Sequence, residues 1–234
     1  MSAAPRLAEL AARYELDEAA VHALAALLDA VADDPEAPTT VSAPTEAVDA
    51  HVADSLVALE LPAVAGAREI ADLGSGAGFP GLALAAALPA ARVCLLESAA
   101  RKCAFLGRAA ARAGIANAEV VHARAEAWDE GREACDVVTA RALAPLSVLA
   151  EYAAPLLREQ GVLVAWKGRR DEGEEADGAF AAAQLGLEPV EIRRVQPFPA
   201  ARERHLHVMR KVAPTPPRFP RRPGMAAKRP LRVA

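Results

Sequence analysis

Hydrophobic positions at helical spacing dominate the first 60 residues of the chain. Leucines and valines recur at intervals of three, four and seven between residues 5 and 32, which predicts one amphipathic helix. A proline-rich loop ends this region, and a second helix is expected from Thr45, as its N-cap, to Glu60. The pattern therefore predicts an N-terminal helical extension over residues 1–62.

A different rhythm starts at Glu69, where short apolar runs alternate with helical segments. Strands are expected near residues 69–75, 92–98, 118–124, 135–142, 161–168, 190–195 and 204–212, and helices near 80–88, 99–113, 146–158 and 172–185. Such alternation predicts an α/β domain over residues 63–213, with a mostly parallel sheet of seven strands covered on both faces. The short connection before the last strand predicts that this strand is antiparallel.

The loop after the first strand carries the first chemical signal. Residues 71–81 read ADLGSGAGFPG, in which Gly76, Gly78 and Gly81 match the dinucleotide fingerprint G-x-G-x-x-G between a strand and a helix. Ligands of open α/β sheets bind at the carboxyl ends of the strands, where an acid about twenty residues further on usually binds the ribose. Glu97, at the end of the second strand, is the candidate for that contact, and Gly76 would let the backbone approach the ligand.

Two residues of this loop distinguish a pyrophosphate ligand from a sulfonium ligand. Asp72 ends the strand, and its carboxylate would repel a pyrophosphate but attract the ammonium and sulfonium groups of S-adenosylmethionine. Pro80 has no N–H to donate, whereas pyrophosphate sites depend on free N–H groups at the helix start. We therefore predict an S-adenosylmethionine site with Asp72 among its contacts, and an NAD-dependent oxidoreductase is the alternative.

The residues at the ends of the third and fourth strands limit which kinds of methyl transfer are possible. The sequence Arg124-Ala125-Glu126 stands where an adenine edge would be bound. The fourth strand ends Thr139-Ala140-Arg141-Ala142, without the polar-Pro-Pro-aromatic tetrad of exocyclic-amine methyltransferases, and Cys135 lies at the wrong end for attack on a pyrimidine. Methylation of guanine N7 needs neither the tetrad nor a nucleophilic cysteine, because the N7 lone pair attacks the methyl group directly. The enzyme then contributes mainly the alignment of N7, methyl group and sulfur. Arg141 would hold a ligand carboxylate or a base, or form a strand-end salt bridge.

Charge is distributed unevenly along the chain. The net charge is −4, yet residues 193–234 contain twelve Lys or Arg residues and one acidic residue, Glu203. This asymmetry is typical of proteins that bind polyanions, although a solvated tail would show it as well. Residues 214–234 are rich in proline and lack acidic residues, which predicts an extended basic arm rather than part of the core.

Cysteine usage and hydropathy exclude other classes of protein. Three cysteines without paired spacing argue against a disulfide framework and against a zinc site, and Cys94 and Cys135 are expected to be buried apolar residues. No apolar run reaches the ~20 residues that a membrane span requires. We expect a cytoplasmic protein without a bound metal.

Several motifs together resemble one family, the bacterial ribosomal RNA small-subunit methyltransferase G family, historically called glucose-inhibited division protein B. They are HVADSL (51–56), DLGSGAGFPG (72–81), LLES and RKCAFL (95–106), ARAE (123–126), DVVTARA (136–142), WKG (166–168) and FPRRPGMAAKRPL (219–231). The resemblance covers almost the whole chain. In the last motif the family usually has Thr-Pro where this chain has Met225-Ala226.

The resemblance implies a Rossmann-like class I methyltransferase that transfers a methyl group from S-adenosylmethionine to N7 of guanine 527 in 16S rRNA, without a general base. Its partner would be 16S rRNA or the small ribosomal subunit, and we expect a monomer. The cofactor contacts carried over from the family motifs are Gly74, Phe79, Ala125, Glu126 and Arg141. A non-catalytic RNA-binding assembly factor with the same fold is the remaining alternative.

Further residues are candidates for contact with RNA. Phosphate contacts come mainly from basic side chains, and we expect them from Lys167, Arg202, Arg218, Arg221, Arg222 and Lys228. The target guanine would leave its stack, and Phe198 or Trp166 would either stack on it or pack in the core. His51 and Asp54 share a helix face, where they have no assigned role or form a buried hydrogen-bonded pair.

Overall fold

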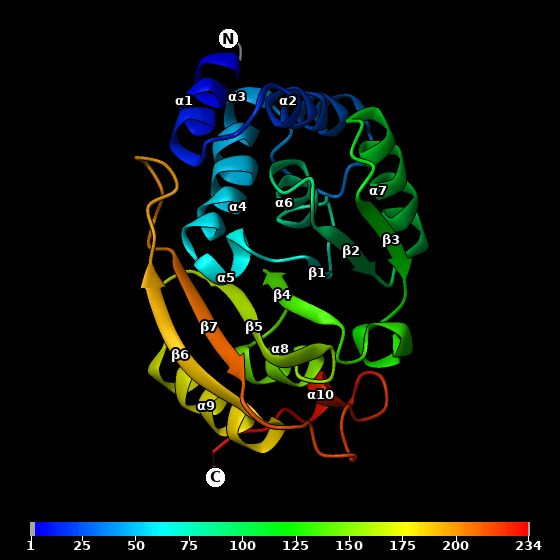
Figure 1. Ribbon diagram of the computed structural model, residues 1–234, viewed down its shortest axis with the longest axis vertical. Helices are drawn as coiled ribbons and strands as arrows, with labels where there is room; N and C mark the ends of the chain where they lie inside the picture. Colours follow the sequence, from blue (N-terminus) through cyan, green and yellow to red (C-terminus); the bar gives the residue numbers. More distant parts are fainter. Residues whose placement is uncertain (1–2, 234) are drawn as a thin grey trace.

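The computed structural model describes residues 3–233 (Figure 1). The predicted extension begins at residue 1 and the predicted arm ends at residue 234, so residues 1–2 and 234 lie outside the described part. A single sheet of seven strands organises the molecule. The strands are β1 (Glu69–Leu73), β2 (Arg92–Glu97), β3 (Ala118–His122), β4 (Cys135–Arg141), β5 (Leu157–Lys167), β6 (Leu187–Arg194) and β7 (His205–Lys211).

The order of strands across the sheet is β3-β2-β1-β4-β5-β7-β6. Strands β1 to β5 pair in parallel, and β7 is antiparallel to both β5 and β6. The mostly parallel sheet with an antiparallel last strand is therefore confirmed. Because β1 and β4 are neighbours while the chain visits β2 and β3 in between, the strand order reverses at β1, and the carboxyl ends there open a crevice for ligands.

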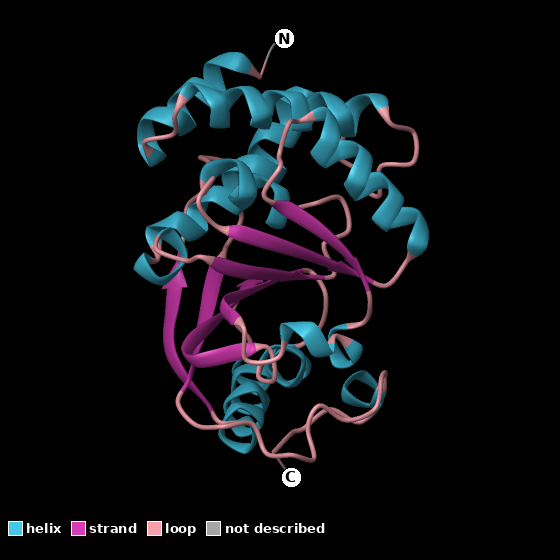
Figure 2. Cartoon of the chain, turned by 45° about the vertical axis from the view of Figure 1, so that its right-hand side comes forward, coloured by secondary structure: helices cyan, strands magenta, loops and turns pink. Residues whose placement is uncertain are grey.

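Helices cover both faces of the sheet, as Figure 2 shows. One face carries the N-terminal helices and two later ones: α1 (Ala4–Tyr14), α2 (Glu18–Asp33), α3 (Pro44–Ala47), α4 (Asp54–Leu56), α5 (Pro62–Ala65), α6 (Gly81–Ala87) and α7 (Ala100–Arg112). The other face carries α8 (Leu146–Ala153) and α9 (Glu172–Leu185), with α10 (Met225–Lys228) beside α8. Alternate strand residues supply the two cores, since Ile70 packs on the first face and Ala71 on the second.

The expected helix over residues 5–32 is two helices. Glu15 adopts a left-handed conformation with φ +54° and ends α1, and the Asp17 carboxylate accepts the Ala20 N–H at 2.7 Å to begin α2. Asp17 is a favourable N-cap, because its side chain satisfies a backbone donor that the first turn leaves free. The apolar residues keep their helical spacing on both sides of this break, so their pattern alone does not predict where the first helix ends.

The second expected helix is continuous but irregular. It begins at Pro44 without a side-chain cap, so the expected cap by Thr45 is wrong. A π-helical segment, Val48–Ala53, precedes α4, and a 3-10 segment, Val57–Glu60, follows it. The π-helical segment directs His51 and Asp54 toward the end of β4, and such segments often accompany functional sites.

The helix after β4 is shorter than expected. It ends at Ala153 rather than at residue 158, because Pro155 cannot donate the next helical hydrogen bond. The chain then enters β5 at Leu157, which pairs with Cys135 across an irregularity in register. Cys135, like Cys94, is buried as expected, and burial raises the pKa of its thiol to about 12.

The C-terminal segment packs against the domain instead of extending from it. Phe219 is 8% exposed and joins the apolar cluster under α8, and Ala226 in α10 is 1% exposed. The expectation of an arm outside the core is therefore wrong for the segment that contains Phe219 and Ala226. The basic residues of this segment would not pack in the core by themselves, but Phe219 buries an apolar side chain there. No helix within residues 3–233 is long and apolar enough to cross a membrane.

Candidate functional site

The carboxylate of Asp72 lies beneath the glycine loop. It accepts the Thr139 hydroxyl at 2.8 Å and the Gly81 N–H at 3.2 Å, and the residue is 1% exposed. Burial raises the pKa of Asp72 to about 6, and the Thr139 hydroxyl opposes that shift. The carboxylate fixes the glycine loop and does not line the cavity described next, so its expected contact with the cofactor stays a prediction.

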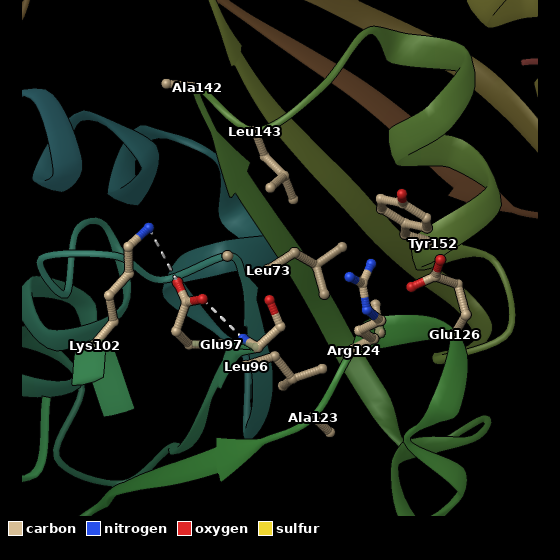
Figure 3. A pocket seen from close by; sticks show the side chains of 13 residues that line it. Leu73, Leu96, Glu97, Lys102, Ala123, Arg124, Glu126, Ala142, Leu143 and Tyr152 are labelled. Carbon is tan, nitrogen blue, oxygen red and sulfur yellow. Dashed lines mark hydrogen bonds and ion pairs between the residues drawn. The ribbon is translucent and has the colours of Figure 1, made fainter. Parts of the chain in front are cut away.

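A cavity of about 300 Å³ opens at the carboxyl ends of β1, β2 and β3. Glu97 and Lys102 stand on one side of it, and Arg124, Glu126 and Tyr152 on the other (Figure 3). The remaining lining residues are Leu73, Gly74, Leu96, Ser98, Ala123, Ala125, Ala142 and Leu143. Four predicted cofactor contacts, Gly74, Glu97, Ala125 and Glu126, are thus brought together in one cavity.

Glu97 is held in a defined orientation at the end of β2. Its Oε1 accepts the Ser98 and Ala99 N–H groups at 2.8 and 2.9 Å, and its Oε2 accepts the Gly76 N–H at 3.3 Å. The Lys102 ammonium lies 3.8 Å from Oε2. Gly76 therefore acts through Glu97, since it does not itself line the cavity, and the carboxylate keeps free acceptor capacity for a ligand hydroxyl.

The backbone at Gly74 needs the absence of a side chain. Its φ is +64°, and a Cβ placed there would lie 2.7 Å from the Leu143 side chain. Glycine adopts this left-handed conformation without steric cost. The loop consequently passes close to the cavity floor, which agrees with the expected close approach of backbone and ligand.

The opposite wall is formed by the segment after β3. Ala125 and Glu126 lie in a 3-10 turn, Ala125–Ala127. The Glu126 side chain is largely buried, and its Oε1 accepts the Gly224 N–H at 2.8 Å. Sequence reasoning did not select Lys102 and Tyr152, although Lys102 belongs to a quoted motif. Tyr152 had no local signal, because α8 reaches this cavity only in the folded chain.

A second cavity, of about 670 Å³, lies on the other side of the β4 terminus and shares Ala142 with the first. It is rich in basic side chains, which are Arg141, Lys167 and Arg204. Its other lining residues are Thr40, Val41, Ala50, His51, Asp54, Ala142, Trp166 and Gly168. Arg141, expected among the cofactor contacts, therefore lines this second cavity and not the first.

Asp54 holds two of these cations. Its Oδ2 accepts Arg141 Nη1 at 2.9 Å, and its Oδ1 accepts Arg204 Nε at 3.3 Å. Arg141 Nη1 also donates to the Ala50 carbonyl at 3.1 Å. Arg204 carried no local sequence signal, since 150 residues separate it from Asp54.

His51 and Asp54 are not paired with each other but serve different partners. His51 Nε2 lies 2.9 Å from the Val41 carbonyl, which can only accept, so this nitrogen carries the proton. Burial lowers the pKa of His51. Its ring stacks on Phe79 with a centroid distance of 4.7 Å. Phe79 is 5% exposed, lines neither cavity and packs the glycine loop against the π-helical segment, so its expected cofactor contact stays a prediction.

The candidate RNA contacts separate into three groups. Lys167 lines the second cavity, where its ammonium lies 2.8 Å from the Ala144 carbonyl and 2.5 Å from the Glu174 carboxylate. Arg221 pairs with the buried Glu151 and is not free for phosphate in this conformation, because the guanidinium already donates to that carboxylate. The remaining four are exposed: Arg202, Arg218, Arg222 and Lys228.

The two candidate stacking residues are largely packed against the protein, and Trp166 also lines the second cavity. Trp166 is 5% exposed, and its Nε1 donates to the Asp54 carbonyl at 2.7 Å. Phe198 is partly buried and packs against the main apolar cluster. Within residues 3–233, no group of three or more His, Cys, Asp or Glu side chains is arranged to hold a metal ion.

Comparison with known proteins gives a family match. The family model described as rRNA small subunit methyltransferase G matches residues 36–206. A protein of Rubrobacter xylanophilus named ribosomal RNA small subunit methyltransferase G is 43% identical over 190 residues, covering 78% of this chain and 72% of the relative. The namesake from Desulfitobacterium hafniense is 38% identical over 196 residues, covering 82% of this chain and 81% of the relative.

Solved structures support the fold class. A 16S rRNA (adenine(1408)-N(1))-methyltransferase from Catenulisporales acidiphilia superposes with a TM-score of 0.53 at 18% identity, over 66% of this chain and 90% of that one. The antibiotic-resistance methyltransferase Kmr superposes with a TM-score of 0.52 at 21% identity, over 66% and 92% of the two chains. These likenesses establish the Rossmann-like methyltransferase fold.

The family match removes the NAD-dependent oxidoreductase alternative, in keeping with a glycine loop whose helix starts after Pro80. Family model, relatives and fold agree: the chain belongs to the rRNA small subunit methyltransferase G family and is an S-adenosylmethionine-dependent rRNA methyltransferase.

Proposed function

We propose that the chain methylates N7 of a guanine in 16S rRNA, with the cofactor in the first cavity and the guanine in the second. The observation that carries this proposal is the junction of the two cavities at Ala142, beyond the end of β4. A methyl group transferred in line must lie between the sulfonium of one ligand and the nucleophile of the other. The residue common to both cavities marks that place.

The cofactor cavity suits an adenosine. Glu97 presents a carboxylate, fixed by three N–H donors, to the ribose hydroxyls. Ala125 and Glu126 offer backbone and carboxylate groups to the adenine edge, and Gly74 leaves room for the methionine part. The protein supplies orientation here, and the bound cofactor supplies an electrophilic methyl group.

The second cavity suits a purine that needs no deprotonation. Its carboxylate, Asp54, already accepts from two arginines, and its histidine, His51, donates Nε2–H to Val41. The other ring nitrogen of His51, Nδ1, has no hydrogen-bond partner but is buried out of contact with solvent, so neither Asp54 nor His51 is placed to remove a substrate proton. Guanine N7 has a lone pair and loses no proton during attack, so positioning by Arg141 and its neighbours is the chemistry required.

The assay uses labelled S-adenosylmethionine with small ribosomal subunits that lack this modification. We expect label in 16S rRNA, and N7-methylguanine at one position when the RNA is cleaved chemically at that base. Methylation of an exocyclic amine, an adenine or another guanine atom would contradict the proposal. Absence of any label would instead support the assembly-factor alternative.

We further propose that three parts of the chain share this task in the cytoplasm, as a monomer. Residues 1–62 support the second cavity, residues 63–213 bind the cofactor, and residues 214–234 contact RNA. The monomer is supported by the distribution of the exposed large apolar side chains: among the described residues only Val190 and Ile192 share an element, the edge strand β6, and the others, such as Leu143, Phe180 and Val233, lie on other segments. Light scattering during gel filtration measures the mass, and a concentration-independent dimer would contradict this part.

A further inference from the structure

The C-terminal segment reaches the cofactor cavity through two separate contacts. In Figure 1 the segment, drawn in red, runs past α9 to α10, which lies beside α8. Phe219 anchors it in the apolar cluster that also contains Trp128 and Leu146. The match to the family model ends at residue 206, so this segment lies beyond the matched range.

The first contact is a buried ion pair. The Glu151 carboxylate is 1% exposed and accepts three donors from Arg221: Nε at 2.8 Å, Nη2 at 2.5 Å and the backbone N–H at 3.2 Å. Two parallel bonds between a guanidinium and a carboxylate define geometry as well as charge. The next residue along α8 is Tyr152, which lines the cofactor cavity.

The second contact is made by the backbone of the arm. The Gly224 N–H donates to Glu126 Oε1 at 2.8 Å, and Glu126 lines the cavity. Gly224 has φ +84°, a conformation that glycine tolerates and other residues rarely adopt. The arm thus orients a carboxylate on the wall where the adenine is placed.

We propose that the C-terminal arm is a structural part of the cofactor site, and that its docking and cofactor binding strengthen each other. Arg221 is then a positioning residue: it holds the arm on Glu151, and the docked arm holds Glu126. This inference rests on the proposed placement of the cofactor in the first cavity. Since binding linkage is reciprocal, bound cofactor must stabilise the docked arm by the same factor. Arg222 and Lys228 are exposed on the same arm. RNA bound to these two side chains would therefore hold the arm that contacts Glu126.

The test measures S-adenosylhomocysteine affinity by calorimetry, without RNA, on the full-length protein. Arg221→Ala is expected to raise Kd about tenfold, the size of a typical coupling, while Arg229→Ala, which removes an exposed arginine of the same arm, leaves Kd unchanged. At saturating cofactor and RNA, kcat of Arg221→Ala should stay within about twofold while KM for the cofactor rises. In the wild type, S-adenosylhomocysteine should slow tryptic cleavage within the arm.

Two further variants keep the result decisive. Gly224→Ala strains the turn without leaving a buried charge, and its Cβ meets no neighbouring atom within 4 Å. If Arg221→Ala does not fold, the affinity of Gly224→Ala for S-adenosylhomocysteine is measured in its place. Glu97→Ala tests the placement of the cofactor itself. Wild-type affinity in the folded arm variants, together with a loss in Glu97→Ala, overturns the coupling alone. Wild-type affinity in all of them overturns the placement of the cofactor and the coupling with it.

Discussion

Asp54 Oδ2 accepts a hydrogen bond from Arg141 Nη1 at 2.9 Å, across 87 residues of sequence. The same carboxylate accepts from Arg204 on its other oxygen. One acid therefore sets the position of two of the cations that line the second cavity, and it is one of the two residues, with His51, whose roles the sequence left open.

Replacing Asp54 should affect both stability and activity. Asp54→Ala leaves Arg141, whose side chain is 17% exposed, without its main partner. Breaking a buried pair from one side costs about 3 kcal/mol of the free energy of unfolding, and methyl transfer should fall because both arginines lose their orientation. Urea denaturation and a methylation assay measure these effects. The isosteric Asp54→Asn, which keeps the shape and one acceptor but removes the charge, is the control and should lose nearly as much as Asp54→Ala in both measurements; near-wild-type stability and activity of Asp54→Asn would refute the electrostatic account.

Arg141→Ala should lower kcat with the fold intact. Arg141 lines the second cavity and not the first, so its loss misplaces the guanine rather than the cofactor. A misplacement of the reacting base costs about 100-fold in rate. S-adenosylhomocysteine affinity should remain at the wild-type value. A large loss of cofactor affinity would return Arg141 to the cofactor contacts, and unchanged kcat would remove it from the site.

The stability of the protein should depend on the titration of Asp72. The pKa of Asp72 is raised by burial to about 6 in the folded protein, from an ordinary value of 3.8. The proton is therefore held more tightly in the folded state, so the contribution is fully present below pH 4 and is lost as the pH rises through 6. The total is roughly 3 kcal/mol.

Asp72→Asn removes this titration with little change in shape. The difference in unfolding free energy between wild type and variant, from urea titrations at pH 4 to 7, should shift in favour of the variant as the pH rises. Curves that stay parallel over this range would show that Asp72 has the same pKa in both states.

Gly74→Ala should weaken cofactor binding more than it weakens folding. A Cβ at this position meets Leu143, whose side chain is 41% exposed and can move, so the main cost is the left-handed backbone. That cost is about 1 kcal/mol. Displacing Leu143, which lines the cavity, should raise Kd for S-adenosylhomocysteine several-fold. Gly114→Ala, at a position with φ +65° where a Cβ meets nothing, is the matched control; equal Kd values in the two variants would contradict this role.

The exposed cations of the arm should contribute to the salt dependence of RNA binding. Changing Arg218, Arg222 and Lys228 to alanine removes three candidate phosphate contacts. The slope of log K against log salt concentration should then become shallower by about 2 to 3. Filter binding over a range of salt concentrations measures it. An unchanged slope would assign these residues to solubility rather than to RNA.

Local rules explain where prediction from sequence succeeded and where it stopped. The alternation of strands and helices and the glycine loop follow from spacing and residue type within short windows. The break at Glu15 and the π-helical segment could not be predicted in this way. The spacing of apolar residues looks nearly the same in a regular helix and in one with a local irregularity of one residue. Arg204 and Tyr152 had no local signal at all.

By itself, the sequence determined the sheet, the position of the glycine loop and the family, because each depends on residues that are close in the chain. Only the tertiary structure decided what the charged residues do. Asp72 faces Gly81 and Thr139 instead of the first cavity, Arg221 is bound to Glu151 instead of exposed, and Asp54 joins Arg141 to Arg204. A buried charge must find a partner of opposite charge or a hydrogen-bond donor, and which partner it meets depends on distances that only folding creates.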